Sequence, residues 1–454
     1  MLRPCFFQCR FSRLVTELKR SLRLVDGLAM VVGIMVGSGI FRTPGLVAAQ
    51  LGRPWLTFLA WVLGGALALL GALCFAELAT RYPRAGGKYV YVREAFGPRA
   101  GFVVGWVEGI AIYPVAIAAI AVVAGEYAGR LAGVEPGHTR WVGVGLAGVF
   151  TAINLAGVAS GRWAQNLATG AKILALAGVV VLAFVAGNGA GWRSTLPTAP
   201  TGGAALVALA LAFQAVIWTY YGYLDAAKIA EEVVDPGRTL PRILLGGIAI
   251  ATTLYLLLNA AFFQVLTIDQ IAASNLAPGD VAAAVTGARG GRLVAGMAVL
   301  VVLASLNGNI FVTPRVIFGL AREGLGPRWL ALVNAGGTPW AAMVLVGAVA
   351  IALAATGTFE SLLGLAITVV LVIDSFTVLS LFRLRARQPN APFLVPLFPW
   401  VPLAFVGVYA ALFVGTTLGR PGLVATALAV LAGAYGLSWT IRTNDEGRVV
   451  GRPG

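Results

Sequence analysis

Long apolar segments separated by short loops dominate this chain and leave few folds open to it. A helix needs about 20 mostly apolar residues to cross a bilayer, and only helices and closed barrels satisfy the backbone there. Of the 454 residues, 59% are hydrophobic and 11% are charged, whereas a soluble domain carries about 25% charged residues. We therefore predict an all-α integral membrane protein with twelve transmembrane helices, at 25–50, 55–79, 99–128, 139–159, 162–186, 205–233, 241–266, 290–321, 339–356, 359–384, 400–417 and 421–441.

The placement of the basic residues predicts the orientation of the chain. The net charge is +15, with 33 Lys and Arg, and most of these fall in loops on the same side as the N-terminus. Positive residues gather on the cytoplasmic side of membrane proteins. Both ends, 1–24 and 442–454, are therefore predicted to be cytoplasmic, and the chain to lie in the plasma membrane. The basic excess is a topology signal, so it gives no support for binding to nucleic acid.

Two glycines and a serine interrupt the first apolar span, at Gly37-Ser38-Gly39. They lie about 13 Å from the start of the apolar run at Leu28, near the middle of a bilayer core of about 30 Å. Unwound backbone in hydrocarbon costs several kcal/mol for each group that protein, water or a ligand leaves unpaired. The interruption therefore predicts a binding site made of main chain, although such residues also occur at helix-packing faces.

A second interruption falls in the sixth span, at 219–223, where three tyrosines surround one glycine. Broken helices at corresponding positions in two halves of a chain indicate a secondary transporter. We predict two inverted five-helix repeats, 25–186 and 205–384, whose first helices carry the interruptions. The last two spans, 400–441, lie outside the repeat.

The two interruptions predict a site for a zwitterion. Past the first one the helix restarts, and its free amides carry a partial positive charge that suits a carboxylate, with Ser38 Oγ and the amides of Gly39 and Ile40 as donors. Free carbonyls before the first interruption and near the second suit an ammonium group. The predicted substrate-binding residues are Met35, Gly37, Ser38, Gly39, Ile40, Trp218, Thr219, Tyr220 and Gly222.

Three ionisable residues fall within predicted spans. Lys172, in the fifth span, must face the bundle interior or a cavity, and a buried lysine can exchange its proton. It is a candidate for proton coupling or for a permanently charged strut. Glu108 and Asp374 are candidates to pair with Lys172, to carry a proton, to attract a cationic substrate, or to hold two helices together. The structural role is favoured for Asp374, and both kinds of role stay open for Glu108.

Charged residues also crowd the predicted cytoplasmic end of the sixth span. Asp225, Lys228 and Glu232 have the spacing that places residues on one helix face. Glu231 and Glu232 are disfavoured by the dipole of a helix C-terminus, so they need cationic partners. We predict an inner-gate ion-pair network, with an ordinary solvated helix end as the alternative. The candidate cations are Arg81, Arg238 and Arg242.

Short motifs recur nearly from end to end of the chain: Gly37-Ser38-Gly39-Ile40-Phe41 with Pro44, Glu77-Leu78-Ala79 with 82–87, 94–98, Glu231-Glu232 with Asp235-Pro236 and Pro241-Arg242, and Ser305-Leu306-Asn307-Gly308 with Arg315 and 321–324. Together they resemble the amino acid–polyamine–organocation superfamily, in particular its bacterial amino acid permeases and L-type transporter branch. The resemblance implies the leucine-transporter-like fold of two five-helix inverted repeats. It also implies alternating access and amino acid substrates held by main-chain atoms.

The resemblance also implies roles for single residues. Trp218 falls where the family places an aromatic lid over the substrate, so we expect it to act as an outer gate. In similar permeases a lysine of the fifth span takes the place of a sodium ion. This implies that Lys172 lies near the carbonyls around Gly33 and near Ser305. Two tyrosines of the second interruption, at 221 and 223, depart from the usual residues, and we expect them to reshape the side-chain pocket.

Cysteine and histidine usage gives no indication of a metal or a cofactor, and none is expected. Cys5 and Cys9 lie in the N-terminal arm, and Cys74 is a small core residue of the second span. His138, the one histidine, is expected to be exposed in an outer loop. Eukaryotic L-type relatives use a cysteine of that loop to bond a heavy chain. The loop at 129–140 contains none, so no disulfide-linked heavy chain is expected.

These observations predict an amino acid permease that is proton-coupled or an exchanger. An enzyme is not expected, because no phosphate loop, metal-ligand spacing or nucleophile triad appears in the sequence. A carrier of cationic amino acids or polyamines is the alternative if Glu108 faces the pocket in its ionised form. An amino-acid-binding membrane receptor or sensor is the alternative from a different class, and it needs a partner surface or an output domain.

Overall fold

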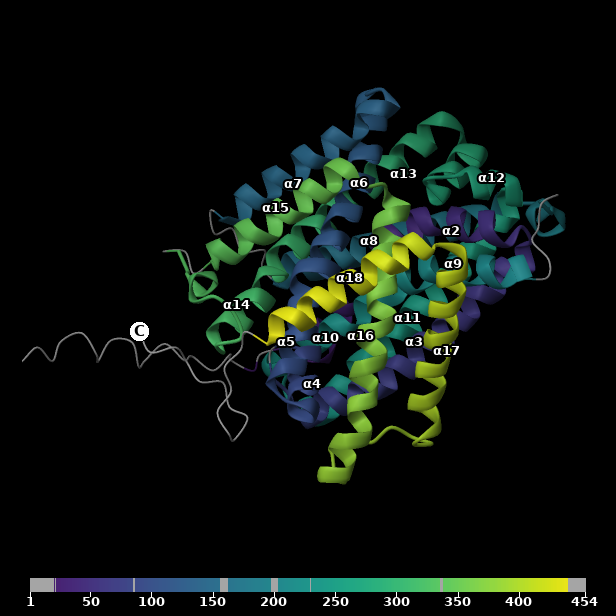
Figure 1. Ribbon diagram of the computed structural model, residues 1–454. Helices are drawn as coiled ribbons and strands as arrows, with labels where there is room; N and C mark the ends of the chain where they lie inside the picture. Colours follow the sequence, from purple (N-terminus) through teal and green to yellow (C-terminus); the bar gives the residue numbers. More distant parts are fainter. Residues whose placement is uncertain are drawn as a thin grey trace, which may run out of the picture.

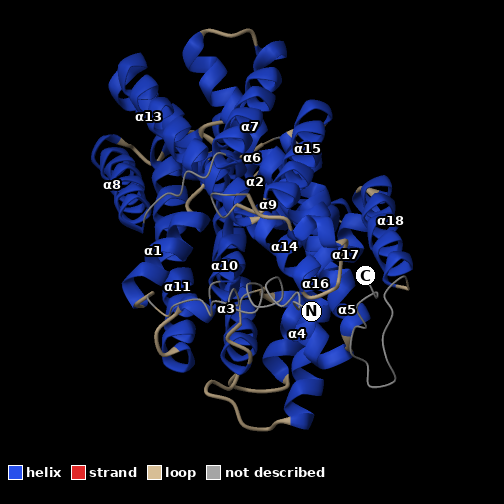
Figure 2. Ribbon diagram, turned by 90° about the vertical axis from the view of Figure 1, so that its left-hand side faces the viewer, coloured by secondary structure: helices blue, strands red, loops and turns tan. Residues whose placement is uncertain are grey.

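The described part of the chain is built of helices (Figures 1 and 2). The computed structural model describes residues 20, 22–84, 86–155, 162–196, 203–228, 230–334 and 338–439. Within these residues, an isolated backbone bridge joins Leu22 to Val233. The predicted cytoplasmic tail and both cysteines of the N-terminal arm lie outside the described residues.

The first predicted span consists of two helices, α1 (Leu24–Met35) and α2 (Ser38–Leu51), that meet at an angle of 43°. Gly37 has φ −120° and ψ −145° and Val36 has φ −78° and ψ 70°, so two successive residues leave the helical region. The helix therefore stops and restarts at the residues that the sequence indicates.

The first half continues with helices that surround this interruption. Their bounds are α3 (Pro54–Arg81), α4 (Lys88–Phe96), α5 (Pro98–Trp106), η1 (Val107–Ile112), α6 (Tyr113–Ala132), η2 (Pro136–His138), α7 (Thr139–Leu155), α8 (Arg162–Ala186) and η3 (Ala190–Arg193). η1 is a turn of π-helix that continues α5 into α6, so the three form one rod. Short π-helical turns of this kind are frequent at functional sites, and this one carries Glu108.

The sixth predicted span begins as a regular α-helix and then changes geometry several times. Thr219 still belongs to the helix, so the interruption begins after Tyr220 and not at residue 219 as expected. The part after Tyr220 is a series of short turns, and Glu232 therefore does not share a continuous helix face with Asp225 and Lys228. The elements in order are α9 (Gly203–Tyr220), η4 (Tyr221–Leu224), α10 (Asp225–Lys228) and η5 (Ala230–Glu232), of which η4 and η5 are 3-10 turns.

The second half contains the longest helices of the chain. In α13 the residue Gly287 has φ 76° and divides the helix at a kink. The bounds are α11 (Pro236–Val265), α12 (Ile268–Ala273), α13 (Ala277–Val312), α14 (Pro314–Arg322), η6 (Arg328–Ala331), α15 (Trp340–Thr356), α16 (Phe359–Arg387), α17 (Trp400–Gly419) and α18 (Pro421–Ser438).

Nine helical segments of the described chain are long and apolar enough to cross a membrane, and α1 with α2 makes a tenth as a bent pair. α15, of 17 residues, is shorter than a typical spanning helix, and the described part of α7 has the same length. Helices occupy all twelve ranges that the sequence indicates. The number of twelve crossings stays a prediction.

The interrupted helices lie inside the bundle. α1 packs against α8 and α11, and α2 packs against α9, α12 and α13. η4 contacts α1, so both interruptions meet in one region. α17 and α18 pack on α16, and α17 also on α9, at one side of this core (Figure 1).

Candidate functional site

The two interrupted spans touch each other through glycines. A Cβ added to Gly39 of α2 would lie 2.9 Å from the Thr219 hydroxyl in α9. A Cβ added to Gly222 of η4 would lie 2.9 Å from the backbone nitrogen of Met35. Both approaches are too close for any larger residue, so glycine is needed at each for packing. The hydroxyls of Thr43 and Thr219, 2.7 Å apart, also join α2 to α9.

A buried tyrosine of α11 bridges the two interruptions. The hydroxyl of Tyr255 lies 2.6 Å from the Met35 carbonyl and 3.1 Å from the Thr219 carbonyl, and donates to these two acceptors. Met35 O also accepts from Gly37 N, at 2.8 Å. The predicted ammonium acceptors therefore already have partners at Met35 and Thr219, which corrects the sequence-based assignment for these two carbonyls. Sequence reasoning missed Tyr255, whose only local signal is a hydroxyl in an apolar span.

The start of α2 is enclosed. Its first amides, those of Gly39 and Ile40 among them, have no acceptor within the helix because a helix leaves its first turn unpaired. Ser38 is buried beside them. A Cβ added to Gly37 would lie 2.9 Å from the Ser305 hydroxyl of α13. Ser305 therefore lies at the start of α2, next to the predicted residues Gly37, Ser38, Gly39 and Ile40.

Lys172 of α8 reaches the end of α1. Its ammonium donates to the Gly33 carbonyl at 3.1 Å, and the side chain is buried. The neighbouring Thr169 hydroxyl donates to the Ala29 carbonyl at 3.2 Å. Among the described residues no carboxylate lies within ion-pair distance of Lys172. The proposed pairing of Lys172 with Glu108 or Asp374 is therefore wrong for this structure.

The two acids instead share a lysine that the sequence reasoning overlooked. Lys88, the first residue of α4, lies 3.1 Å from Glu108 Oε1 and 2.6 Å from Asp374 Oδ1. Its ammonium also donates to the Tyr221 hydroxyl and lies 4.8 Å from the centre of that ring. We call Lys88, Glu108, Asp374 and Tyr221 the Lys88 cluster. Because α4 follows a loop motif, Lys88 reads as an exposed loop residue, and only the packing of α4 under the bundle buries it.

Lys88 is buried, outside the candidate spanning helices. The two neighbouring carboxylates keep it charged. Burial alone would lower the pKa of Lys88, but Asp374 and Glu108 outweigh burial and raise the pKa above its ordinary value. The Tyr113 hydroxyl donates to Glu108 at 3.2 Å. The cluster is therefore held from four elements: α4, the α5–η1–α6 rod, η4 and α16.

A second cation-bridged acid pair lies far along the same two helices. Arg42 of α2 contacts Glu126 of α6 at 2.5 Å and Glu360 of α16 at 2.7 Å. Glu126 follows Glu108 along the rod by about 27 Å, at about 1.5 Å per residue. We call Arg42, Glu126 and Glu360 the Arg42 cluster. Each of the two clusters thus has one cation between one carboxylate from the rod and one from α16.

The predicted aromatic lid lies beside the Arg42 cluster. The ring of Trp218 meets that of Phe359 edge to face, with centroids 6.0 Å apart. Arg42 lies 5.6 Å from the centre of the same Phe359 ring. Trp218 is half-buried, and its role as a lid stays a prediction.

The predicted inner-gate network is only partly present. Lys228 and Asp225 form an ion pair, but Arg81 does not bind Glu231 or Glu232 as suggested. Arg81 instead contacts Glu77 at 2.6 Å, and Arg385 Nε contacts the same carboxylate at 2.8 Å. Arg81 is unavailable because Glu77, four residues earlier on α3, is its helix neighbour.

The carboxylate of Glu232 is influenced by a different cation. Arg315 of α14 interacts with this carboxylate electrostatically. The backbone carbonyl of Glu232 accepts from Leu22 N at 2.9 Å. The start of the described chain is thus attached to the end of the sixth span. The gate roles of Glu231 and Glu232 stay predictions.

The tyrosines of the second interruption do not surround the contact between the two breaks. Tyr220 donates to the Trp61 carbonyl of α3 at 3.2 Å, and a Cβ on Gly71 of α3 would lie 2.2 Å from the Tyr223 hydroxyl. Tyr221 belongs to the Lys88 cluster. All three tyrosines also border one cavity of about 10 Å³ between α3, α9, η4 and α17, enough for about one water. The expectation that the rings of Tyr221 and Tyr223 reshape a side-chain pocket stays a prediction, and so does a direct substrate contact of Tyr220.

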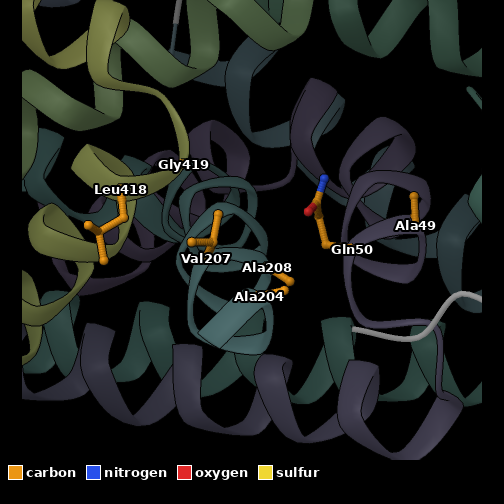
Figure 3. Close-up of a pocket in the computed structure, with 7 residues that line it drawn as sticks. All are labelled: Ala49, Gln50, Ala204, Val207, Ala208, Leu418 and Gly419. Carbon is orange, nitrogen blue, oxygen red and sulfur yellow. The ribbon is translucent and has the colours of Figure 1, made fainter. Parts of the chain in front are cut away.

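A larger groove, of about 410 Å³, opens between α2, α9 and α17 (Figure 3). It contains none of the predicted site residues, and most of its side chains are small and apolar, with Gln50 as the exception. It therefore takes no part in the candidate site. Its lining residues are Ala49, Gln50, Ala204, Val207, Ala208, Leu418 and Gly419.

A family comparison covers most of the chain. The family described as "Amino acid permease" matches residues 22–432. The chain belongs to the amino acid permease family. It is therefore a membrane transporter and not an enzyme, as the sequence analysis expected. The match begins at Leu22 and includes both interrupted spans, Lys172 and the two ionic clusters.

Individual members of the family are similar over nearly their whole length. The serine/threonine exchanger SteT of Bacillus subtilis (strain 168) is 30% identical over 427 residues, which cover 92% of this chain and 96% of that protein. The Asc-type amino acid transporter 1 of Mus musculus is 32% identical, with coverage of 89% and 78%. The b(0,+)-type amino acid transporter 1 of Mus musculus is 30% identical, with coverage of 89% and 84%.

A solved structure shares the fold. The nucleobase-cation-symport-1 family transporter Mhp1, in a closed conformation with bromovinylhydantoin bound, superposes with a TM-score of 0.57. The alignment covers 93% of this chain and 92% of that chain, at 15% sequence identity. At this identity the likeness shows the fold alone. It supports a helical transporter architecture of the kind that the sequence indicated.

Proposed function

We propose that this protein moves amino acids across the plasma membrane by alternating access, as an exchanger or as a proton-coupled permease. The observation that carries the proposal is the contact between the two interrupted spans, where Gly39 meets Thr219 and Gly222 meets Met35. Main-chain groups that a helix leaves unpaired then face one region, which is what recognition of an amino acid backbone requires.

The carboxylate of the substrate is assigned to the start of α2. Ser38 Oγ and the amides of Gly39 and Ile40 are its donors, helped by the positive end of the helix dipole. Its ammonium is assigned to carbonyls next to those that Tyr255 already occupies, at the end of α1 and at Trp218 and Tyr220. Trp218 closes the path on the side of the Arg42 cluster.

The wider architecture follows from the same proposal. Residues 25–186 and 205–384 form two inverted five-helix repeats, and 400–441 adds two helices, which gives twelve crossings. The basic loops then put both chain ends in the cytoplasm. The α4 end of the bundle is the inner end, and the Arg42 cluster belongs to the outer end.

Lys172 supplies the positive charge that holds the end of α1, which removes the need for a sodium ion. Its bond to Gly33 O supports this role. Exchange is supported by the relative SteT, which is named as an exchanger. The protein acts without a disulfide-linked heavy chain in this proposal, since the loop at 129–140 has no cysteine.

The alternative of a cationic amino acid or polyamine carrier loses its main support. It required Glu108 to face the pocket in its ionised form, and Glu108 is instead bound to Lys88. The receptor alternative has no observation in its favour, because the family matched along the chain consists of permeases.

Transport by purified protein in liposomes tests the proposal. A panel of radiolabelled amino acids is supplied outside, with unlabelled amino acid inside, and exchange of at least one of them is expected. Ser38→Trp fills the assigned carboxylate position and is expected to abolish binding and exchange, whereas Thr426→Trp on the exposed face of α18 serves as the control. Unchanged affinity in Ser38→Trp would refute the assigned site, and no exchange in the wild type would refute the function.

A further inference from the structure

The Lys88 cluster contains an excess of acid in a place that water does not reach. Two carboxylates share one ammonium, so the fully ionised cluster carries a net negative charge. The exposed fractions of the Glu108 and Asp374 side chains are 2% and 0%. Asp374 Oδ2 is buried without a hydrogen-bond partner in the described part of the chain. A buried, uncompensated negative charge is strongly unfavourable.

The Arg42 cluster provides an internal comparison with the same stoichiometry. There, too, two carboxylates share one cation, but the Glu126 and Glu360 side chains are 28% and 35% exposed. Water can hydrate the excess charge at that end. Burial, and not the number of charges, therefore distinguishes the two clusters.

Among the residues that the structure describes, the other ionisable groups near the Lys88 cluster do not supply a second positive charge. Lys228 of α10 lies 3.7 Å from the centre of the Tyr113 ring and is paired with Asp225. The remaining groups are neutral phenols that interact with the two carboxylates electrostatically. They come from α4, α6, η4 and α17: Tyr91, Tyr113, Tyr221, Tyr223 and Tyr409.

We propose that the Lys88 cluster is a proton-binding site, in which Glu108 and Asp374 together hold one exchangeable proton beside the charged Lys88. Two carboxylates that share a buried site do not both ionise readily. With one proton bound, the cluster is neutral: one ammonium, one carboxylate and one carboxylic acid. The proton belongs to the pair and not to either acid alone.

The cluster is connected to the candidate substrate site through one peptide bond. The Tyr221 hydroxyl accepts from Lys88 and faces Asp374 at 3.5 Å. The next residue, Gly222, packs against the end of α1. Loss of the proton changes the charge that Tyr221 faces, and Tyr221 is the first residue of the 3-10 turn in the sixth span. For its consequence in transport, this inference rests on the proposed function.

Two neutral variants imitate the protonated cluster and test the site. Exchange is measured in liposomes at equal pH on both sides, from about pH 6 to about pH 9.5. The wild-type exchange rate is expected to fall as pH rises, by up to about tenfold for each pH unit above the pKa of the pair, because the buried cluster then loses its proton. Asp374→Asn and Glu108→Gln are expected to vary less than about twofold over the same range. Glu360→Gln, in the hydrated Arg42 cluster, keeps the alkaline loss.

Melting temperature in detergent provides a measurement that needs no transport. As pH rises, the melting temperatures of Asp374→Asn and Glu108→Gln are expected to increase relative to that of the wild type, because only the wild type develops a buried charge. The difference in melting temperature between Glu360→Gln and the wild type is expected to stay constant. An alkaline decline and a melting difference that are the same in wild type, Asp374→Asn and Glu108→Gln would overturn the proton site. If the wild-type protein exchanges no amino acid, the proposed function is contradicted. The melting temperatures of the variants then test the proton site without any transport measurement.

Discussion

The hydrogen bonds of Tyr255 yield the most direct test of how the two interrupted spans act together. Tyr255→Phe removes one hydroxyl that serves the carbonyls of Met35 and Thr219. The ring stays in place, and no other side chain is predicted to move, since Tyr255 is 0% exposed. The change therefore isolates the bridge between α1 and α9.

The size of the effect follows from the acceptors that are left unpaired. A buried acceptor without a partner costs about 1–3 kcal/mol. Met35 O retains its bond from Gly37 N at 2.8 Å, so the lower part of that range applies, about 1–2 kcal/mol. If the arrangement of the breaks that binds substrate is the one that needs the bridge, it bears this cost; since about 1.4 kcal/mol corresponds to a factor of ten, substrate affinity is expected to fall by up to about 5- to 30-fold.

The assay is equilibrium binding of a transported, radiolabelled amino acid to purified protein, together with the melting temperature. Tyr127→Phe is the matched control, because the buried Tyr127 hydroxyl donates to the Asn275 carbonyl at 2.7 Å, away from both interruptions. The control is expected to lose stability but to keep its affinity. Affinity within about twofold of the wild type in Tyr255→Phe, or an equal loss in both variants, refutes the reasoning.

Three further predictions concern the same region and its surroundings. Gly222→Ala puts a Cβ 2.8 Å from the Ile34 side chain. A destabilisation of about 1–3 kcal/mol and loss of exchange are expected. The control Gly296→Ala, which has open space around it, is expected to leave the melting temperature unchanged. Lys172→Ala removes the charge that holds the end of α1 at Gly33 O, so exchange is expected to fall at every pH, and exchange equal to that of the wild type contradicts this role. Glu77→Gln leaves Arg81 and Arg385 without their shared carboxylate. The free energy of unfolding is expected to fall by about 3 kcal/mol, which lowers the melting temperature. A melting temperature equal to that of the wild type shows that solvent replaces the carboxylate.

The sequence alone predicted the helices and the place where the first span breaks. Both depend on local properties: the length of apolar runs, and a Gly37-Ser38-Gly39 stretch that weakens a helix wherever it occurs. The second interruption was predicted two residues early, because α9 continues to Tyr220, whose ring packs on Trp61 of α3 and Tyr255 of α11. Local propensity contains no information about that packing.

The contacts of charged residues were predicted less well. Glu108 and Asp374 were recognised as unusual acids, because a carboxylate inside an apolar span is conspicuous. Their partner was not found, since Lys88 is separated from Asp374 by most of the chain and lies in a loop motif. Arg42 and its two acids were overlooked for the same reason: single charges near span ends are ordinary in sequence.

By itself, the sequence determined that this protein is a helical membrane transporter and predicted a main-chain site at its breaks, because hydrophobic length and glycine placement act locally. Only the tertiary structure decided which polar groups remain available there. Tyr255 occupies two of the expected carbonyls, and the tyrosines around Gly222 turn to α3 and to Lys88. These contacts join residues that are far apart in the chain. In a buried site, each ion and each hydrogen-bonding group pairs with the group that the packing of the helices places next to it.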